Sequence, residues 1–241
     1  HPRCYPEPPA RPETALPELA WPEPAVPEPK QPARTGGVGF SVAKPPLPPP
    51  VTNPPPAETL RPVTASEFPP DDPYFPNQWY LQHIGVTEAW KTTRGSRRVI
   101  VALVATGIDW LHPELVDNLW VNPGEVPGNG LDDEGNGFVD DVHGWDFVDN
   151  DNDPMPLREG SEPHLYHHGT AMASIIGAKP GNGIGLAGAC WEVSIMCLRA
   201  MPEHLRSFNT IPPISRSLEY AQRMGARIVN CSWGKDAFTQ Q

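Results

Sequence analysis

From residue 98 onward, the apolar residues alternate between strand-like runs and helix-like spacing. Apolar runs of strand length lie at Arg98–Val104, Val193–Leu198 and Arg227–Ser232. The first run has no alternation, which is typical of a strand buried on both faces. Two helix candidates separate the runs, a small-residue segment at 168–178 and an amphipathic segment at 215–224. Strand, helix, strand, helix, strand in this order predicts right-handed crossovers, and hence an α/β fold with a parallel sheet and flanking helices.

Two other segments complete the predicted elements. Val86–Trp90 predicts a short helix whose amino-terminal cap is Thr87. Residues 116–166 are rich in Gly, Pro, Asn and Asp and predict a long polar loop. No internal repeat is visible along the chain.

Composition changes near residue 66. Of the 34 prolines in the 241 residues, twenty lie in the first 62. Proline lacks the backbone N–H that helices and sheets need, and this part has few large apolar residues to bury. We therefore expect residues 1–66 to be a disordered or polyproline II extension and residues 67–241 to form the domain. A spacer or propeptide-like role is favoured for the extension, with a ligand for a proline-binding module as the alternative.

The overall charge restricts the partners. A formal net charge of −11 argues against nucleic-acid binding, and no basic stripe contradicts it. No apolar run approaches the roughly 18 residues of a membrane span. No signal peptide is visible and the chain begins with His, so we expect its true amino terminus to lie elsewhere. Cys190, Cys197 and Cys231 have apolar neighbours, which favours buried free thiols over a disulfide.

Several short blocks carry the candidate chemistry. They are Ala105 with Thr106-Gly107-Ile108-Asp109, His112-Pro113-Glu114-Leu115, His168-Gly169-Thr170, and Asn230-Cys231-Ser232-Trp233-Gly234. In this order and spacing the blocks resemble the subtilisin-like serine peptidases, or subtilases (peptidase family S8). The resemblance covers about residues 70–241 and the first half of that family's catalytic domain. It implies the family's parallel α/β fold, here in truncated form.

The resemblance also implies roles for these residues. A serine peptidase needs a serine that attacks, a histidine that takes its proton and an aspartate that orients the histidine. His168 stands at the position of the histidine, but Ala105 stands at the position of the aspartate. No Gly-Thr-Ser-Met-Ala segment, which carries the serine in the family, occurs before Gln241. The family hydrolyses peptide bonds, whereas these residues predict that this chain is inactive as given.

The resemblance gives the chain part of a peptide-binding site. Ser232, Trp233 and Gly234 would form one wall of the first specificity pocket and pair with an extended peptide. The Gly-rich opposite edge of the family is not recognisable in Phe208–Pro213. The expected partner is therefore a peptide or protein, as substrate or as bound partner.

Acidic residues predict a metal site in the long loop. Between Glu125 and Asp153 there are ten acidic residues and no Lys or Arg. Asp132, Asp133, Asn136 and Asp140 group hard oxygen ligands with turn-forming glycines, which suits a structural Ca²⁺ ion. The spacing is not that of an EF-hand, and a solvated acidic loop is the alternative.

A second calcium site follows from the resemblance alone. Its ligands in this chain would be the side chains of Gln78, Glu114 and Asn182 and the backbone carbonyls of Ile184 and Leu186. A calcium requirement would favour an extracellular or secretory location.

Three functional interpretations remain open at this stage. The first is a pseudo-protease or a fragment of a longer active protease. The second is a non-catalytic peptide- or protein-binding module that uses the sheet and the acidic loop. The third, an active enzyme completed by a separate chain that carries the serine, is disfavoured by Ala105.

Overall fold

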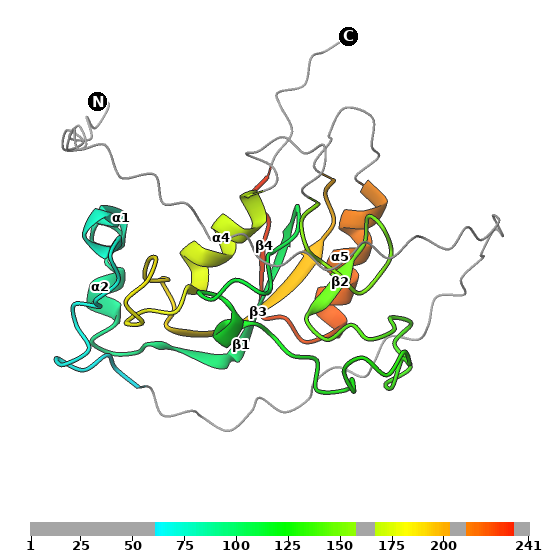
Figure 1. Cartoon of the computed structure of the whole chain (residues 1–241), viewed down its shortest axis with the longest axis horizontal. Helices are drawn as coiled ribbons and strands as arrows, with labels where there is room; N and C mark the ends of the chain where they lie inside the picture. The colour runs from blue at the N-terminus through cyan, green and yellow to red at the C-terminus, as the bar shows by residue number, and fades with distance from the viewer. Residues whose placement is uncertain (1–60, 158–166, 203–210, 234–241) are drawn as a thin grey trace, which may run out of the picture. The chain divides into compact units, whose positions relative to one another are not determined.

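Four strands form one parallel sheet in the computed structural model, which describes residues 61–157, 167–202 and 211–233. These residues all belong to one compact unit, 46–241. The strand order is β2-β3-β1-β4, with β1 at Gly95–Ala105, β2 at Gly144–Asp146, β3 at Glu192–Arg199 and β4 at Ile228–Asn230 (Figure 1). The predicted fold class, a parallel α/β sheet with flanking helices, is confirmed.

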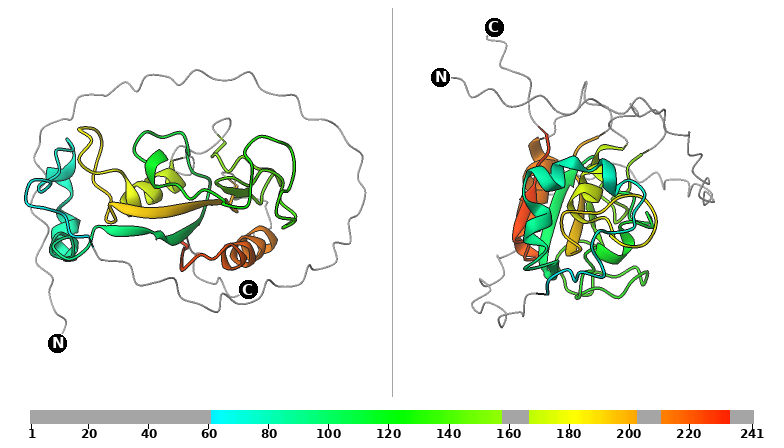
Figure 2. Two further views of the ribbon diagram at one scale, coloured as in Figure 1. Left: turned by 90° about the horizontal axis from the view of Figure 1, so that it is seen from below. Right: turned by 90° about the vertical axis from the view of Figure 1, so that its left-hand side faces the viewer.

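Two helices cover the sheet from opposite sides, α4 (His168–Gly177) and α5 (Ile211–Arg223) (Figure 2). Successive side chains of a strand point to opposite faces. Leu103 of β1 accordingly packs in the core cluster that contains Ala173 of α4, and Val104 packs in the cluster that contains Tyr220 of α5. Burial on both faces explains why the second half of β1 is uninterruptedly apolar.

Short helices and an aromatic cluster lie at the amino end of the domain. They are η1 (Phe75–Asn77), α1 (Trp79–His83) and α2 (Val86–Ala89), and Leu81, Trp90 and Trp191 are buried beside them. The predicted cap of α2 at Thr87 is wrong. The residue before the helix is Gly85, with φ of +77° and no side-chain cap hydrogen bond, and Thr87 lies inside the helix.

The segment predicted as one polar loop contains two short elements, η2 (Val116–Asn118) and strand β2. Strand β2 was missed because three residues are too few to show a hydrophobic period. Its Gly144 passes very close to β3, because a Cβ there would lie 1.9 Å from the Cys197 carbonyl oxygen.

Residues 61–66, which the sequence assigns to the extension, hydrogen-bond to the domain. Val63 N donates to Trp90 O at 2.8 Å, and Arg94 N donates to Arg61 O at 2.7 Å. The disorder predicted for residues 1–60 lies outside the described residues. Pro212 and Pro213 occupy the first turn of α5, where backbone N–H groups have no partner within the helix.

Three cysteines of the described residues are free, as predicted. Cys197 is buried and Cys190 is partly buried, but Cys231 is exposed, so its predicted burial is wrong. None of the helices in the described part of the chain has the length and apolar character needed to cross a membrane.

Candidate functional site

At the carboxyl ends of three neighbouring strands, one residue of each strand lies beside the next. Ala105 of β1 pairs with Arg199 of β3, and Arg199 pairs with Asp146 of β2. Paired positions in parallel strands project from the same face. For Ala105 this is the face that α4 covers, since it shares a core cluster with Ala173. Open α/β sheets bind ligands at the carboxyl ends of their strands, so this edge is the candidate active site.

Two glycines bring His168 to this edge. Helix α4 begins at His168, and a Cβ on Gly169 would lie 1.9 Å from the Gly107 carbonyl oxygen and 3.3 Å from the Ala105 Cβ. Gly107 has φ of +109°, and a Cβ there would lie 2.6 Å from Pro156 N. The glycines of the two sequence blocks therefore allow the start of α4 to lie against the turn after β1.

The two ring nitrogens of His168 have different surroundings. Nε2 lies 3.0 Å from the Ser232 carbonyl oxygen. Because a carbonyl oxygen only accepts hydrogen bonds, Nε2 carries the proton in this contact. Nδ1 is buried and has no hydrogen-bond partner among the described residues. In a catalytic triad the reverse holds, because Nδ1–H donates to the aspartate and Nε2 accepts the proton of the serine.

Two carboxylates near this edge are engaged elsewhere. Asp109 Oδ1 accepts a hydrogen bond from Leu111 N at 3.1 Å, which is a local turn contact. Asp146 forms a buried ion pair with Arg199, which also contacts Asp149 at 2.7 Å. Burial raises the pKa of Asp146 to about 6, although the charge of Arg199 opposes this rise. In the part of the chain that is described, no hydrogen bond joins Asp109 or Asp146 to His168.

The predicted pocket wall lies beside His168. Ser232 contributes the carbonyl oxygen that His168 contacts, and the Trp233 indole Nε1 donates to the Val104 carbonyl oxygen at 3.0 Å. Asn230 Nδ2 donates to Ser232 Oγ at 2.9 Å. The third predicted residue, Gly234, lies outside the described residues. The structure thus brings Ser232 and Trp233 to the same edge as Ala105.

Residues of the second predicted calcium site also come together. Asn182 Nδ2 donates to Glu114 Oε1 at 2.9 Å, and Leu186 N donates to Glu114 Oε2 at 3.3 Å. Ile184 N donates to Asn182 Oδ1 at 3.1 Å. Gln78 lies beside the end of this loop, where its side-chain amide makes two hydrogen bonds of 2.8 Å to the backbone of Ala187.

Asp72 is a buried carboxylate at this place that sequence reasoning missed. It accepts hydrogen bonds from Gly181 N, at 2.9 and 3.1 Å, and from Asn182 N, at 3.3 Å. Burial raises the pKa of Glu114, and the nearby charge of Asp72 adds to the rise. Two buried carboxylates that repel each other beside an amide oxygen form a donor set that suits calcium. The adjacent pair Asp71-Asp72 was a signal in the sequence.

We use the name acidic insert for residues 122–143. The four predicted ligands in it mainly support turns. Asp132 accepts from Asn136 N and Gly137 N, at 2.9 and 2.7 Å, and Asp140 accepts from Asn129 N and Gly130 N, at 3.2 and 2.8 Å. Asp133 accepts from Val126 N and Asn129 Nδ2, both at 2.9 Å. Asn136 Oδ1 accepts from Phe138 N at 2.7 Å, and its Nδ2 also donates to Asp141 at 3.0 Å and contacts Glu134.

A different set of carboxylates converges in the insert. Glu125, Glu134 and Asp141 each place an oxygen within 4.8 Å of the others. Glu125 Oε2 is buried and has no hydrogen-bond partner among the described residues. Burial, followed by the charges of nearby carboxylates including Asp141, raises the pKa of Glu125. An unpartnered buried oxygen in an all-carboxylate group fits a hard divalent cation such as calcium.

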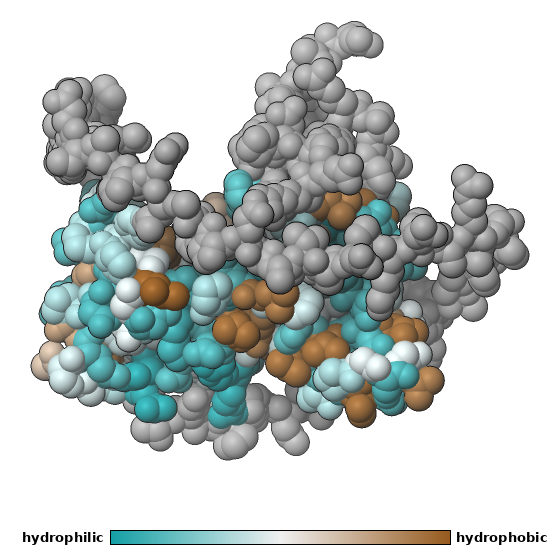
Figure 3. Space-filling model, in the orientation of Figure 1, coloured by the Kyte–Doolittle hydropathy of each residue, from teal (hydrophilic) through white to brown (hydrophobic). Residues whose placement is uncertain are grey.

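A close contact at a glycine and the burial of two side chains hold the three carboxylates in place. Glu134 lies against the backbone of Gly124, where a Cβ would be only 1.6 Å from Glu134 Oε2. Asp141 is fully buried, and Glu125 is 8% exposed. The insert also exposes apolar side chains such as Val126 and Leu131, and Figure 3 shows brown residues among the teal ones on this view of the surface.

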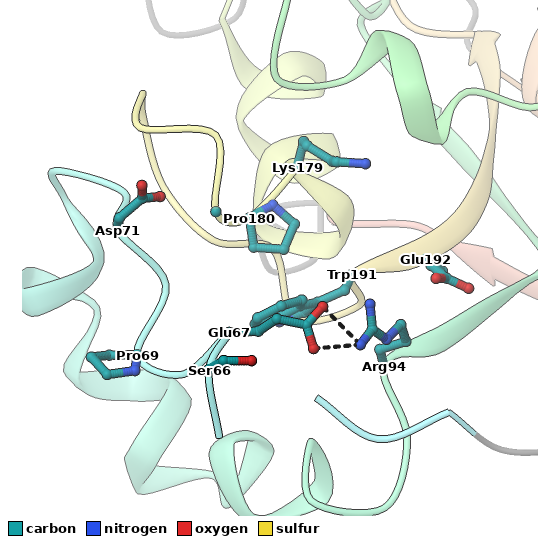
Figure 4. Close-up of a pocket in the computed structure, with 10 residues that line it drawn as sticks. Ser66, Glu67, Pro69, Asp71, Arg94, Lys179, Pro180, Trp191 and Glu192 are labelled. Atoms are coloured by element: carbon teal, nitrogen blue, oxygen red, sulfur yellow. Dashed lines mark hydrogen bonds and ion pairs between the residues drawn. The ribbon is translucent and has the colours of Figure 1, made fainter. Parts of the chain in front are cut away.

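A cavity of about 400 Å³ lies at the opposite end of the sheet, where Arg94 precedes β1 and Glu192 begins β3. Arg94, Glu67 and Trp191 line it, and Glu67 accepts two hydrogen bonds from Arg94 (Figure 4). None of the residues predicted for catalysis, peptide binding or calcium lines this cavity.

Comparisons with known proteins agree with the resemblance. Residues 96–241 match the model of the subtilase family. Subtilisin-like protease 1 of Plasmodium vivax is 30% identical over 172 residues, which are 70% of this chain and 26% of that protein. Thermophilic serine proteinase of Bacillus sp. (strain AK1) is 32% identical over 171 residues, which are 70% of this chain and 35% of that protein. The chain thus spans about a quarter to a third of the length of these relatives.

A solved structure is also similar to this chain. It is a serine protease of Aeromonas sobria in complex with its chaperone. The match has 20% sequence identity and a TM-score of 0.49, and it covers 70% of this chain and 26% of that one.

Proposed function

Because the chain belongs to the subtilase family of subtilisin-like serine proteases, we propose that His168 is the family's catalytic histidine without its aspartate and that this domain does not hydrolyse peptide bonds. One observation carries the proposal. His168 Nδ1 is buried without a partner among the described residues, and Nε2 is directed at the Ser232 carbonyl oxygen.

The chemistry follows from the tautomer. A general base must present an unprotonated nitrogen to the serine hydroxyl, and the aspartate secures this by binding the proton on the other nitrogen. With Ala105 in that place, no hydrogen-bond acceptor among the described residues favours Nδ1–H, and the contact with Ser232 favours Nε2–H. In subtilisin itself, removal of the aspartate alone lowers kcat about 3 × 10⁴-fold, a measured property of that enzyme. A loss of this order leaves little proteolysis.

The test compares the full natural protein with its His168→Ala variant. Each is incubated with a fluorophosphonate, which labels activated serines, and with an unstructured peptide substrate. We expect labelling and turnover to be equally low in both. Labelling or turnover that disappears in His168→Ala would overturn the proposal, because it would require a working base at residue 168.

A second candidate function is the binding of a peptide or protein without cleavage. It is favoured by β4, which ends the described sheet and carries the exposed side chains Ile228 (53%) and Val229 (40%). A strand at a sheet edge offers backbone groups to an added strand. Ser232 and Trp233 follow this edge directly and would contact the residues of such a peptide.

We further propose that calcium stabilises the domain at two places. At the amino end, Asp72, Glu114 and Asn182 would hold it, with Gln78 and the carbonyl groups of Ile184 and Leu186 as the further ligands that the family resemblance suggests. In the acidic insert, the group of Glu125, Glu134 and Asp141 is best supported, because Glu125 Oε2 is unpartnered within the described residues. The predicted ligands Asp132, Asp133, Asn136 and Asp140 would then shape the loop around it.

Bound calcium would neutralise carboxylates that repel one another and link segments far apart in sequence. Calcium is abundant outside cells, so these sites favour an extracellular or secretory location for the protein.

A further inference from the structure

A buried tyrosine connects the acidic insert to helix α5. Tyr220 is 2% exposed, and its hydroxyl donates to Asp141 Oδ2 at 2.6 Å. Its ring packs edge-to-face against Phe138 and Phe147, with centroid distances of 4.9 and 5.7 Å. A tyrosine hydroxyl is protonated at neutral pH and a carboxylate only accepts, so Tyr220 is the donor in this hydrogen bond. Phe138 and Asp141 of the insert therefore contact the ring and the hydroxyl of Tyr220, and Phe147, just after the insert, also contacts the ring.

Asp141 is oriented by three donors. Asn122 Nδ2 donates to Oδ1 at 2.7 Å, and Asn136 Nδ2 and the Tyr220 hydroxyl donate to Oδ2 at 3.0 and 2.6 Å. The two asparagines belong to the insert itself, whereas Tyr220 comes from α5. Hydrogen bonds of this kind fix the direction of a metal-binding carboxylate, and their removal typically lowers metal affinity about 10–100-fold.

The chain after Tyr220 leads directly to the candidate active site. Met224 N donates to Tyr220 O, and Arg227 N then donates to Ile100 O of β1. Strand β4 follows beside β1, and two residues after its end comes Ser232, whose carbonyl oxygen contacts His168. A change in the position of α5 thus has a short covalent route to the pocket wall.

We propose that Tyr220 is a positioning residue that orients Asp141 for calcium and thereby couples occupation of the acidic insert to the position of α5 and β4. This inference rests on the calcium binding proposed above for the insert. Coupling of two equilibria is reciprocal, so a residue that improves calcium binding by holding Asp141 must itself be held more firmly when calcium is bound. Calcium would then order the wall that carries Ser232 without touching it.

Tyr220 also has a simpler explanation, in which the hydroxyl merely satisfies its hydrogen bond in the core. The two explanations differ in calcium affinity. A structural role predicts lower stability of Tyr220→Phe at all calcium concentrations, with unchanged affinity. A positioning role predicts weaker calcium binding, because Asp141 Oδ2 loses its shortest donor.

The first experiment is a calorimetric titration of Ca²⁺ into the metal-free full chain. Glu125→Gln with Glu134→Gln identifies the heat that belongs to the insert. We expect Tyr220→Phe to weaken this site at least about tenfold. Tyr74→Phe is the matched control, because the Tyr74 hydroxyl has no hydrogen bond to the described residues, and it should leave the affinity unchanged.

The outcomes separate the two proposals. If the insert binds calcium with equal affinity in Tyr220→Phe and the unchanged protein, the role of Tyr220 is overturned and the calcium site stands. If no calcium binding is lost in the Glu125→Gln, Glu134→Gln variant, calcium in the insert is overturned, and the role of Tyr220 with it.

Hydrogen–deuterium exchange of the unchanged protein gives a second test that needs no variant to fold. We expect added Ca²⁺ to slow amide exchange in the insert and also in the last turn of α5 and in β4. Slower exchange confined to residues 122–143 would overturn the coupling, even with calcium bound.

Discussion

Residue 105 lies at the carboxyl end of β1 and is 1% exposed. Its methyl group faces the start of α4, and the next strand places Arg199 beside it. A carboxylate at this position would lie beside the paired residue Arg199 and close to the start of α4, which is His168. An alanine offers neither charge nor acceptor, and His168 Nδ1 has no hydrogen-bond partner among the described residues. Under the function proposed above, the tautomer of the ring is therefore set by the contact with Ser232.

Ala105→Asp should change that tautomer. We expect the proton of the neutral ring to move from Nε2 to Nδ1, because the new carboxylate accepts a hydrogen bond from Nδ1. Long-range ¹H–¹⁵N spectra of histidine-labelled protein distinguish the two tautomers directly. Ala105→Val adds volume without an acceptor and should keep the Nε2–H form. An unchanged spectrum in Ala105→Asp would contradict the assignment of residue 105 as the missing orienting position.

Sequence blocks located the residues around His168 and most of the group at Glu114 and Asn182, but not the carboxylates that converge in the acidic insert. Ala105, His168 and Ser232 lie in distinctive motifs, and the fold brings them to one edge. Asp132 and Asp140 also stand out in the sequence, yet they support turns through backbone N–H groups. Aspartate is common both in turns and at metal sites, and only burial and convergence separate the two uses. The burial of Glu125 depends on contacts that no local pattern encodes.

At the scale of the elements, the packing of helix α4 depends on one close contact at a glycine. Gly169 lies where a Cβ would be 1.9 Å from the Gly107 carbonyl oxygen, which is backbone and has little freedom to move. The same contact places His168 at the strand edge. Helix α4 can therefore pack this closely only because residue 169 has a hydrogen atom in place of a side chain.

Gly169→Ala should destabilise the domain by about 3 kcal/mol or more, at the upper end of overpacking. Urea unfolding of the full chain measures the loss. Ala171→Ser, at an exposed position of the same helix, is the control and should cost roughly 0.5 kcal/mol. Similar stability of the two variants would contradict the close approach of α4 to the turn after β1.

A second element-level contact holds residues 61–67, the amino-terminal strap, at the other end of the sheet (Figure 4). Glu67 bonds to Arg94, at 2.7 Å, and also accepts from Thr64 N and Oγ1. The Arg94 hydrogen bond, with those of Thr64, lowers the pKa of Glu67 from 4.5 to about 2. Since the folded pKa is the lower one, the ionised Glu67 stabilises the folded chain above about pH 4.5, and this stabilisation is lost as the pH falls toward 2.

Glu67→Gln should therefore lower the melting temperature at pH 6 and have progressively less effect as the pH falls from 4.5 to 2.5. Thermal unfolding of both proteins across this range measures the difference. Glu88→Gln removes an exposed ion pair to Lys91 and should have a small effect, because such pairs contribute little. A difference for Glu67→Gln that stays constant with pH would contradict the ion pair with Arg94.

The elements themselves were predictable where burial on both faces leaves a continuous apolar run. The runs at Arg98–Val104 and Val193–Leu198 lie within β1 and β3. Prediction failed where the position of an element depends on a packing contact or a backbone conformation that the apolar pattern does not show. Strand β2 exists because Gly144 fits against β3, and α2 begins after Gly85 because that residue adopts a left-handed conformation rather than because Thr87 caps it.

At the scale of the whole molecule, the main feature is the number and the burial of the carboxylates. The net charge is −11, and several carboxylates are buried rather than solvated, among them Asp72, Glu114, Glu125 and Asp141. Burial raises the pKa of the last three, which expresses the free-energy cost of keeping them charged. Bound calcium, as proposed above, would offset this cost, and the two groups share no residue, so their effects on stability should add.

Calcium should accordingly raise the melting temperature of the full chain in two separable steps. At 100 times its Kd, an ion that binds only the folded state adds about 2.7 kcal/mol, or roughly 5–10 °C for a domain of this size. Asp72→Asn with Glu114→Gln should remove one step, and Glu125→Gln with Glu134→Gln the other. Asp132→Asn with Asp133→Asn should lower the melting temperature without calcium but keep the calcium step, since these residues support the loop. If instead this last variant alone abolishes the insert step, the ligands are those that stand out in the sequence, and the convergent group of Glu125, Glu134 and Asp141 is not the site.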